Sequence, residues 1–128
     1  MALTITHISL LVEDVQKALI FYSDKMGLEV IENHGGYAEL RANAHMKLSL
    51  FDRKAMEEAL PMVHASAING HRSVLEFNVD ALDEFCGALR TKGVVFVSEP
   101  TDRPDWGIRT AYIQDLDGNL ISLYQSLG

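Results

Sequence analysis

The chain has 128 residues, of which 48% are hydrophobic and 23% are charged, and its formal net charge is −7. This length and balance predict one globular domain with a buried core, not a disordered chain. The acidic balance argues against nucleic acid or an anionic membrane as a partner, because both attract basic surfaces.

No run of about 18 apolar residues occurs, so we expect no membrane span. The N-terminal stretch has no basic region ahead of its apolar residues, so we expect no signal peptide. The single cysteine, Cys86, has no second cysteine with which to form an internal disulfide. Such cysteine usage is typical of a reducing compartment, and we expect a cytoplasmic protein.

The first half of the chain predicts the order β-α-β-β-β. Leu3–Val12 alternates imperfectly and predicts a largely buried strand that contains His7. Asp14 is placed to cap a helix, and Gly27 is placed to end it. The apolar stripe of this helix consists of Val15, Ala18, Leu19, Tyr22 and Met26. Three short strands are then expected at Leu28–Asn33, Tyr37–Arg41 and Lys47–Phe51.

The same order returns after a connector, residues 52–71, in which Ala55–Leu60 predicts a short helix. Asp80 is placed to cap the second long helix and Gly93 to end it. The expected strands are Ser73–Val79, Val94–Ser98, Gly107–Gln114 and Leu120–Tyr124. Glu99–Asp105, which contains proline, is expected to be a loop.

The chain is predicted to close on a hairpin with a tight turn at Asp115–Asn119. The last strand of this hairpin, Leu120–Tyr124, matches Lys47–Phe51 in the first half. Residues 1–128 are therefore predicted to form one domain of two β-α-β-β-β modules, residues 3–51 and 72–126. The predicted fold class is α+β, with two curved mixed sheets that face each other around a cleft.

Three stretches have the order and spacing of a known family. They are His7–Val12 leading to Met26–Leu28, Val79–Leu82 leading to Lys92–Val94, and Asp115–Ile121. Together they resemble the vicinal oxygen chelate superfamily, which includes glyoxalases, extradiol dioxygenases, fosfomycin-resistance proteins and bleomycin-resistance proteins. The resemblance implies the glyoxalase/bleomycin resistance-like fold and a homodimer.

The resemblance also implies a divalent metal held by His and Glu residues from the first and last strands of the modules. His7 matches one of these positions. The others hold Ser49, Val74 and Ser122, and serine hydroxyls are poor metal ligands while valine offers none. His71, near the expected second histidine, is the residue that a bulge would bring closer to the cleft. We therefore expect no metal and no cofactor, with a divalent metal as the alternative.

Strand alternation predicts which side chains line the cleft. Their mixture of aromatic, hydroxyl and carboxylate groups suits a small organic ligand with a few polar groups. The predicted ligand-binding residues are His7, Ser9, Ser49, Glu76, Trp106, Arg109, Tyr112 and Ser122.

Several of these residues have a second interpretation. His7 faces the cleft or is a satisfied core residue. Glu76 pairs with His7 as an acid/base couple, or it bonds Lys47 or Arg109, or it reaches solvent. Trp106 is a lid over the ligand or a plug at the end of the sheet. Arg109 recognises an anionic group of the ligand or lies on the outer surface.

The predicted function is the binding of a small organic molecule in a metal-free cleft, as in bleomycin-resistance proteins. The alternative is an enzyme of the same superfamily: a lyase, isomerase or dioxygenase. Such an enzyme uses a metal, or it is metal-free with His7 and Glu76 as the candidate catalytic residues. A pure interaction module is disfavoured because the predicted cleft keeps its polar groups.

Overall fold

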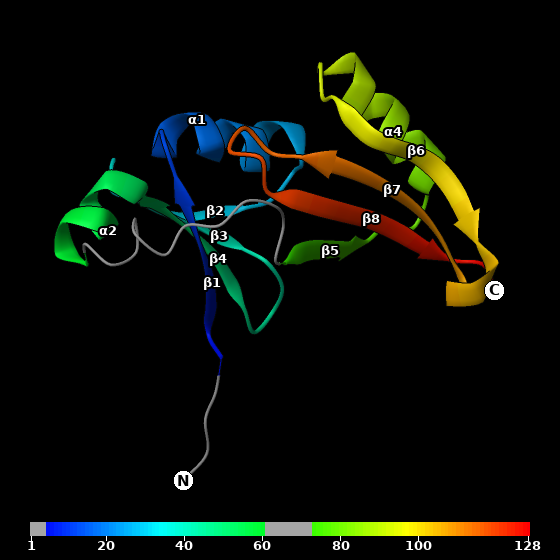
Figure 1. Cartoon of the computed structure of the whole chain (residues 1–128), viewed down its shortest axis with the longest axis horizontal. Coiled ribbons are helices and arrows are strands. Elements are labelled where there is room, and N and C mark those ends of the chain that lie inside the picture. Colours follow the sequence, from blue (N-terminus) through cyan, green and yellow to red (C-terminus); the bar gives the residue numbers. More distant parts are fainter. Residues whose placement is uncertain (1–4, 61–72) are drawn as a thin grey trace, which may run out of the picture. The chain divides into compact units, whose positions relative to one another are not determined.

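The computed structural model describes residues 5–60 and 73–128. The chain divides into two compact units, residues 1–69 and 70–128, and each contains a four-stranded sheet (Figure 1). His71 lies outside the described residues, so its predicted role is not addressed by the fold. Within the described ranges, no helix has the length and apolar character needed to cross a membrane.

The first unit begins with a strand and a helix and then adds three strands. Its elements are β1 (His7–Val12), α1 (Val15–Ile20), the π-helix η1 (Phe21–Lys25), β2 (Val30–Asn33), β3 (Tyr37–Arg41), β4 (Lys47–Asp52) and α2 (Arg53–Ala59). The sheet order is β1-β4-β3-β2. β1 and β4 are parallel, and the other two pairs are antiparallel, so the sheet is mixed as predicted.

The helix of the first unit starts and ends where its sequence indicates. The Asp14 side chain accepts a hydrogen bond of 3.0 Å from the backbone N–H of Lys17, which caps α1. The chain leaves η1 through Gly27, whose φ is +88°, a value that an L side chain rarely adopts. This cap and this glycine place the helix directly against the sheet strands that follow it in sequence.

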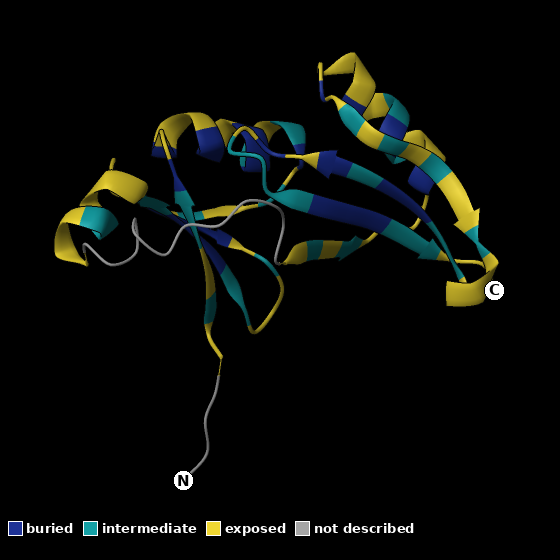
Figure 2. Cartoon of the chain, viewed as in Figure 1, coloured by how far each residue is buried: buried dark blue, intermediate teal, exposed yellow. Residues whose placement is uncertain are grey.

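The first sheet has one apolar and one polar face. The apolar face lies under α1 and is fully buried at its centre, through Val12, Ala38, Leu40, Leu48 and Leu50 (Figure 2). The alternate residues of the same strands point to the opposite side. We call this side the polar face of the first sheet, defined by His7, Ser9, Tyr37, Glu39, Lys47 and Ser49.

The second unit repeats this plan. Its elements are β5 (Val74–Asn78), α4 (Leu82–Thr91), β6 (Phe96–Arg103), the 3-10 helix η2 (Pro104–Trp106), β7 (Ile108–Gln114) and β8 (Leu120–Ser126). The sheet order is β5-β8-β7-β6, with β5 and β8 parallel. α4 packs on β6, β7 and β8 and buries Leu82, Cys86 and Leu89 (Figures 1 and 2).

Two local predictions in the second unit are wrong. Glu99–Asp105 is not a loop, because β6 continues through Pro100 to Arg103. β6 is the edge strand, where a missing backbone N–H is tolerated, and a register shift occurs between Ser98 and Thr101. Asp80 does not cap α4; the side chain of Gln125 accepts a 2.7 Å hydrogen bond from the N–H of Leu82 instead.

The closing hairpin has the predicted turn. The Asp115 carboxylate accepts backbone hydrogen bonds from Asp117 (2.9 Å) and Asn119 (2.8 Å), and Gly118 has φ +82°. β7 and β8 then pair from Ile108 with Ser126 to Gln114 with Leu120. The face of this sheet away from α4 is the polar face of the second sheet, defined by Glu76, Arg103, Thr110, Tyr112, Ser122 and Tyr124.

Candidate functional site

The two polar faces carry matching rows of side chains. In the first unit, Ser49 on β4 lies between Ser9 on β1 and Glu39 on β3. In the second unit, Ser122 on β8 lies between Glu76 on β5 and Tyr112 on β7. Each row therefore has a serine at its centre and one glutamate at its side. The repeat places polar groups where the strand pairing is most regular.

Glu39 is the centre of a hydrogen-bonded cluster in the first unit. Its side chain is only 8% exposed. His7 Nε2 lies 3.0 Å from Glu39 Oε2, and Lys47 Nζ lies 3.4 Å from Oε1. The Tyr37 hydroxyl donates to Oε2 as well. A buried carboxylate is stable only when donors replace its water shell, and three donors do so here.

The His7 ring is bonded at both nitrogens. Nε2 contacts Glu39, and Nδ1 lies 2.8 Å from the hydroxyl of Thr6. With Nε2 donating to the carboxylate, the neutral ring accepts the Thr6 hydroxyl proton at Nδ1. The sequence left open whether His7 is a functional or a satisfied residue. Its side chain is 33% exposed and lies on the polar face, so it is both bonded and accessible.

The protonation states in this cluster follow from its contacts. The hydrogen bond from Tyr37, followed by that from His7, lowers the pKa of Glu39 below its usual range, and burial opposes this only in part. Burial, together with the hydrogen bond to Glu39, raises the pKa of Tyr37. Glu39 is therefore ionised and Tyr37 is neutral at physiological pH. The cluster presents one buried negative charge to the polar face.

The two serines at the row centres are engaged within their own sheets. Ser49 Oγ lies 3.2 Å from the Tyr37 hydroxyl, and Ser122 Oγ lies 3.2 Å from Thr110 Oγ1. Tyr37 and Thr110 occupy equivalent positions in the two repeats, opposite Phe51 and Tyr124. Both serines are buried. Each repeat thus builds the same cross-strand hydroxyl pair, which stabilises the sheet.

Aromatic rings surround the Glu39 cluster. Tyr37 stacks on His34 with a centroid distance of 6.5 Å and meets Phe51 edge-on at 6.0 Å. These contacts hold the Tyr37 ring in place beside the carboxylate. The polar face of the first sheet therefore combines a fixed negative charge with flat apolar surface.

The predicted residues of the second unit do not form one cluster. Glu76 is exposed on the edge strand β5, and Tyr112 is half-buried on β7. Trp106 is 61% exposed in η2, where the guanidinium of Arg103 lies 5.5 Å from its ring centroid. In the first unit, His7 contacts the carboxylate of Glu39. Glu39 is not among the residues that the sequence predicts for the site.

Arg109 lies on the side of the second sheet that faces α4. It donates to both carboxylate oxygens of Asp83 on α4, at 3.0 and 3.1 Å, and to Asp102 on β6 at 2.9 Å. These bonds raise the pKa of Arg109 above its usual range and lower the pKa of Asp83. Of the two interpretations of Arg109, the structure favours the outward one, because two carboxylates already occupy the guanidinium.

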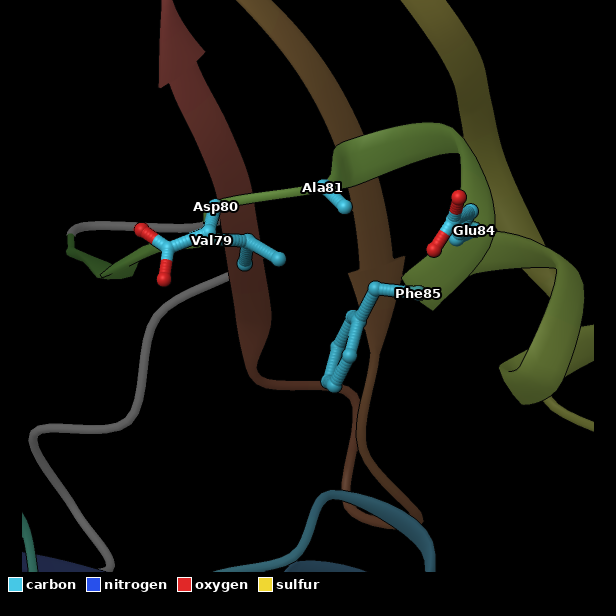
Figure 3. A pocket seen from close by; sticks show the side chains of 5 residues that line it. All are labelled: Val79, Asp80, Ala81, Glu84 and Phe85. Carbon is cyan, nitrogen blue, oxygen red and sulfur yellow. The ribbon is translucent and has the colours of Figure 1, made fainter.

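A surface pocket of about 360 Å³ lies at the start of α4 (Figure 3). Its lining residues are Val79, Asp80, Ala81, Glu84 and Phe85. The Asp80 carboxylate is turned away from the ring of Phe85 in Figure 3. This pocket is separate from the polar face of the second sheet, since it lies beside the helix that covers the opposite side of that sheet.

The donors that the family resemblance assigns to a metal do not fit a divalent ion here. His7 is bonded at both nitrogens, and Ser49 and Ser122 are buried in hydroxyl pairs. Val74 offers no donor atom. Across residues 5–60 and 73–128, no group of three or more His, Cys, Asp or Glu side chains is placed to hold a metal ion.

Sequence reasoning missed Tyr37 and Glu39, although a signal for both was present. β3 reads Tyr-Ala-Glu-Leu-Arg, in which apolar Ala38 and Leu40 alternate with Tyr37, Glu39 and Arg41. This alternation places the polar set on the same face as Ser49. A carboxylate on a central strand needs donors nearby, which points to His7 and Lys47 on the neighbouring rows.

Comparison with known proteins agrees with this architecture. A sequence model of the Glyoxalase/Bleomycin resistance protein/Dioxygenase superfamily matches residues 4–123. Over 125 residues the chain is 36% identical to the uncharacterized protein YraH of Bacillus subtilis (strain 168), covering 94% of this chain and 97% of YraH. It is 23% identical over 122 residues to the bleomycin resistance protein of Geobacillus stearothermophilus, covering 91% of this chain and 92% of that protein.

Among solved structures, the chain is similar to TnmS3, an antibiotic binding protein from Streptomyces sp. CB03234. The TM-score is 0.75 at 26% sequence identity, and the match covers 98% of each chain. The family match extends over nearly the whole length and includes both repeats. This chain belongs to the Glyoxalase/Bleomycin resistance protein/Dioxygenase superfamily.

Proposed function

We propose that this protein binds a small organic molecule through polar side chains of its sheets, and that it does so without a bound metal ion. The observation that carries the proposal is the contact of His7 Nε2 with Glu39 Oε2 at 3.0 Å. His7 is the one residue that matches the family's metal ligands. In this contact its ring is hydrogen-bonded to a carboxylate. The imidazole is then a hydrogen-bonding group of the site rather than a ligand of an ion.

The remaining positions support the same proposal. A divalent ion needs about three protein ligands of suitable chemistry. Ser49 and Ser122 keep their hydroxyls in buried pairs with Tyr37 and Thr110, and Val74 has no donor. Opening either pair leaves a buried hydroxyl without a partner, which costs about 1–3 kcal/mol.

The chemistry of the first polar face indicates the kind of ligand it accepts. The ionised Glu39 is suited to N–H or O–H donors of a ligand, and Tyr37 and Phe51 offer aromatic surface. The proposed ligand contacts on this face are His7, Ser9, Tyr37 and Glu39. Within the second unit, the candidate contacts are Glu76 and Tyr112 on its own polar face and Trp106 on η2. The names of two similar proteins, a bleomycin resistance protein and an antibiotic binding protein, support a ligand of this class.

We further propose that the protein acts as a cytoplasmic homodimer. Its one cysteine, Cys86, is buried in the helix core, and burial raises its pKa, so the thiol stays protonated.

The dimer is an inference from the family resemblance alone. Size-exclusion chromatography with light scattering tests it: a mass near twice 14.2 kDa supports a dimer, and a mass near 14.2 kDa contradicts it.

A second candidate function, metal-independent acid/base catalysis, rests on the same cluster. His7 bonded to an ionised Glu39 is an arrangement that orients an imidazole for proton transfer. In this case His7 transfers the proton, and Glu39 holds the His7 ring in position. Turnover of a bound ligand that His7→Gln abolishes while binding remains would favour the enzyme over the binding protein.

The experiment that tests the proposed function measures ligand binding in the presence of a chelator. Isothermal titration with metal-free bleomycin and a panel of aromatic amides is expected to give saturable binding in EDTA. His7→Ala is expected to weaken that binding about tenfold, the effect of losing one hydrogen bond to a charged network. His45→Ala, at an exposed turn histidine, serves as the matched control and is expected to bind normally.

Two outcomes contradict the proposal. One is binding that appears only after addition of a divalent metal. The other is the absence of any binding across the panel by a protein whose circular dichroism and thermal unfolding are normal.

A further inference from the structure

Arg103 differs from the other arginines that the structure describes. The other four are paired with carboxylates: Arg41 with Glu29, Arg53 with Glu13, Arg90 with Glu99, and Arg109 with Asp83 and Asp102. Within residues 5–60 and 73–128, Arg103 has no such partner, and its Nε is buried without a hydrogen bond. An arginine donor that is buried and unsatisfied calls for a ligand or another explanation.

The two carboxylates of β6 are already used. β6 carries two acids before Arg103, and Glu99 pairs with Arg90 while Asp102 pairs with Arg109. Arg109 also reaches Asp83 on α4, so Asp102 and Arg109 point to the helix side of the sheet. Arg103 is the next residue along β6 and pairs with Ile108, so it points to the polar face. It supplies a positive charge on the face where Tyr112 and Ser122 also lie.

The turn after β6 fixes the position of this side chain. η2 starts with Pro104 and ends at Gly107, whose φ is +72° and whose N–H donates to Pro104 O at 3.1 Å. Gly107 O in turn accepts from the N–H of Leu127 at 3.1 Å. The Arg103 guanidinium lies 5.5 Å from the ring centroid of Trp106, three positions later. The ring remains 61% exposed.

We propose that Arg103 binds an anionic group of the ligand, such as a carboxylate or sulfonate, beside the exposed ring of Trp106. A guanidinium presents several donors in one plane, which matches the two oxygens of such an anion. Because Nε is buried, the anion contacts the terminal nitrogens of the guanidinium. No described carboxylate of the second unit forms an ion pair with them. This inference rests on the proposed function, because it names a chemical group of the small organic ligand, and it does so from the second unit alone.

Trp106 allows a direct test because it is the only tryptophan in the chain. Its fluorescence therefore reports on this turn alone. The probes are 4-nitrobenzoate, 4-nitrobenzyl alcohol and 4-nitrobenzylamine, which share a quenching ring and differ in charge. We expect 4-nitrobenzoate to bind at least about tenfold more tightly than the other two at low ionic strength.

Two variants assign the effect to Arg103. Arg103→Gln is expected to bind the three probes equally, with the preference for the anion lost. Arg90→Gln is the matched control, because Arg90 also lies over an aromatic ring, Phe96 at 4.7 Å, but is paired with Glu99. It is expected to keep the full preference.

Equal affinities of the three probes for the native protein would overturn the anion proposal and leave small-molecule binding intact. So would a preference that survives in Arg103→Gln. A lack of saturable quenching by all three probes also overturns it. The chelator-based binding panel then shows separately whether the proposed function fails too.

Discussion

His7 and Glu39 are 32 positions apart in sequence and are joined by a 3.0 Å hydrogen bond that passes over a third strand. In the sheet order β1-β4-β3-β2, β4 separates their strands, so the two backbones are about 10 Å apart. His7 lies beside Lys47 of β4, and Glu39 lies beside Ser49 of β4. The side chains of His7 and Glu39 therefore meet above β4. The contact ties the first strand of the unit to the third and fixes a charge on the polar face.

The first prediction concerns the charge of Glu39. Glu39→Gln is expected to lower the free energy of unfolding at pH 7 by about 1–3 kcal/mol, because Lys47 and His7 lose an ionised acceptor. The pKa of Glu39 is lowered in the folded state, so its contribution is present above the ordinary glutamate pKa of about 4.3 and is lost as pH falls through the depressed value. Urea unfolding from pH 3 to 7 measures this.

The matched control for that prediction is Glu32→Gln, which removes an exposed carboxylate 3.3 Å from His34. Its effect is expected to be close to zero at every pH, as for most exposed ion pairs. A destabilisation by Glu39→Gln that is constant from pH 3 to 7 would contradict the assigned charge of Glu39.

The second prediction concerns Tyr37, whose hydroxyl donates to Glu39 and contacts Ser49. Tyr37→Phe is expected to cost about 1–2 kcal/mol of stability, because Ser49 stays buried without its partner. The pKa of Glu39 is expected to rise when this donor is lost, so acid destabilisation begins at a higher pH. Tyr124 occupies the position in the second repeat that Phe51 occupies in the first. Tyr124→Phe is the control and is expected to unfold like the native protein. Identical acid profiles for Tyr37→Phe and the native protein would argue against the contact.

The third prediction uses the buried hydroxyl pair of the second unit. Thr110→Val and Ser122→Ala each leave the other hydroxyl without its partner and are each expected to cost about 1–2 kcal/mol. The double variant removes both hydroxyls and is expected to cost clearly less than the sum. Urea unfolding of the four proteins at one pH gives the coupling energy. Strict additivity would show that the 3.2 Å pair does not contribute to stability.

The repeat and its elements were predictable because local signals specify them. The helix stripes, the Asp14 cap, Gly27 and Gly93 all act within a few residues of where they lie. The matched last strands then reveal the duplication. The strand orders β1-β4-β3-β2 and β5-β8-β7-β6 come from the structure, because a β-α-β-β-β repeat allows more than one pairing of its strands.

The parts that were not predictable depend on contacts between residues far apart in sequence. Pro100 reads as a loop signal, and only its place on an edge strand allows β6 to continue through it. Asp80 has the chemistry of a cap, yet Gln125 reaches α4 from the end of the last strand. The sequence does not indicate whether Asp80 or Gln125 lies closer to the first turn of α4.

The same holds for the candidate site. His7 was selected, but its partner Glu39 was not, because their contact crosses an intervening strand. The sequence left Arg109 open between recognition of an anion and a place on the outer surface, and its position on β7 turns it toward Asp83. Arg103 is placed on the opposite face by a register that includes a shift earlier in β6. Alternation alone does not reveal such a shift.

The measurement that tests the central claim most directly is the metal content and metal affinity of the purified protein. Elemental analysis, followed by calorimetric titration with nickel, zinc, manganese and iron(II), is expected to show less than stoichiometric metal and no tight binding. Binding of one ion per chain with a Kd below about 1 μM, lost in His7→Ala and retained in His45→Ala, would contradict the account. It would show that His7 leaves Glu39 to serve as a ligand.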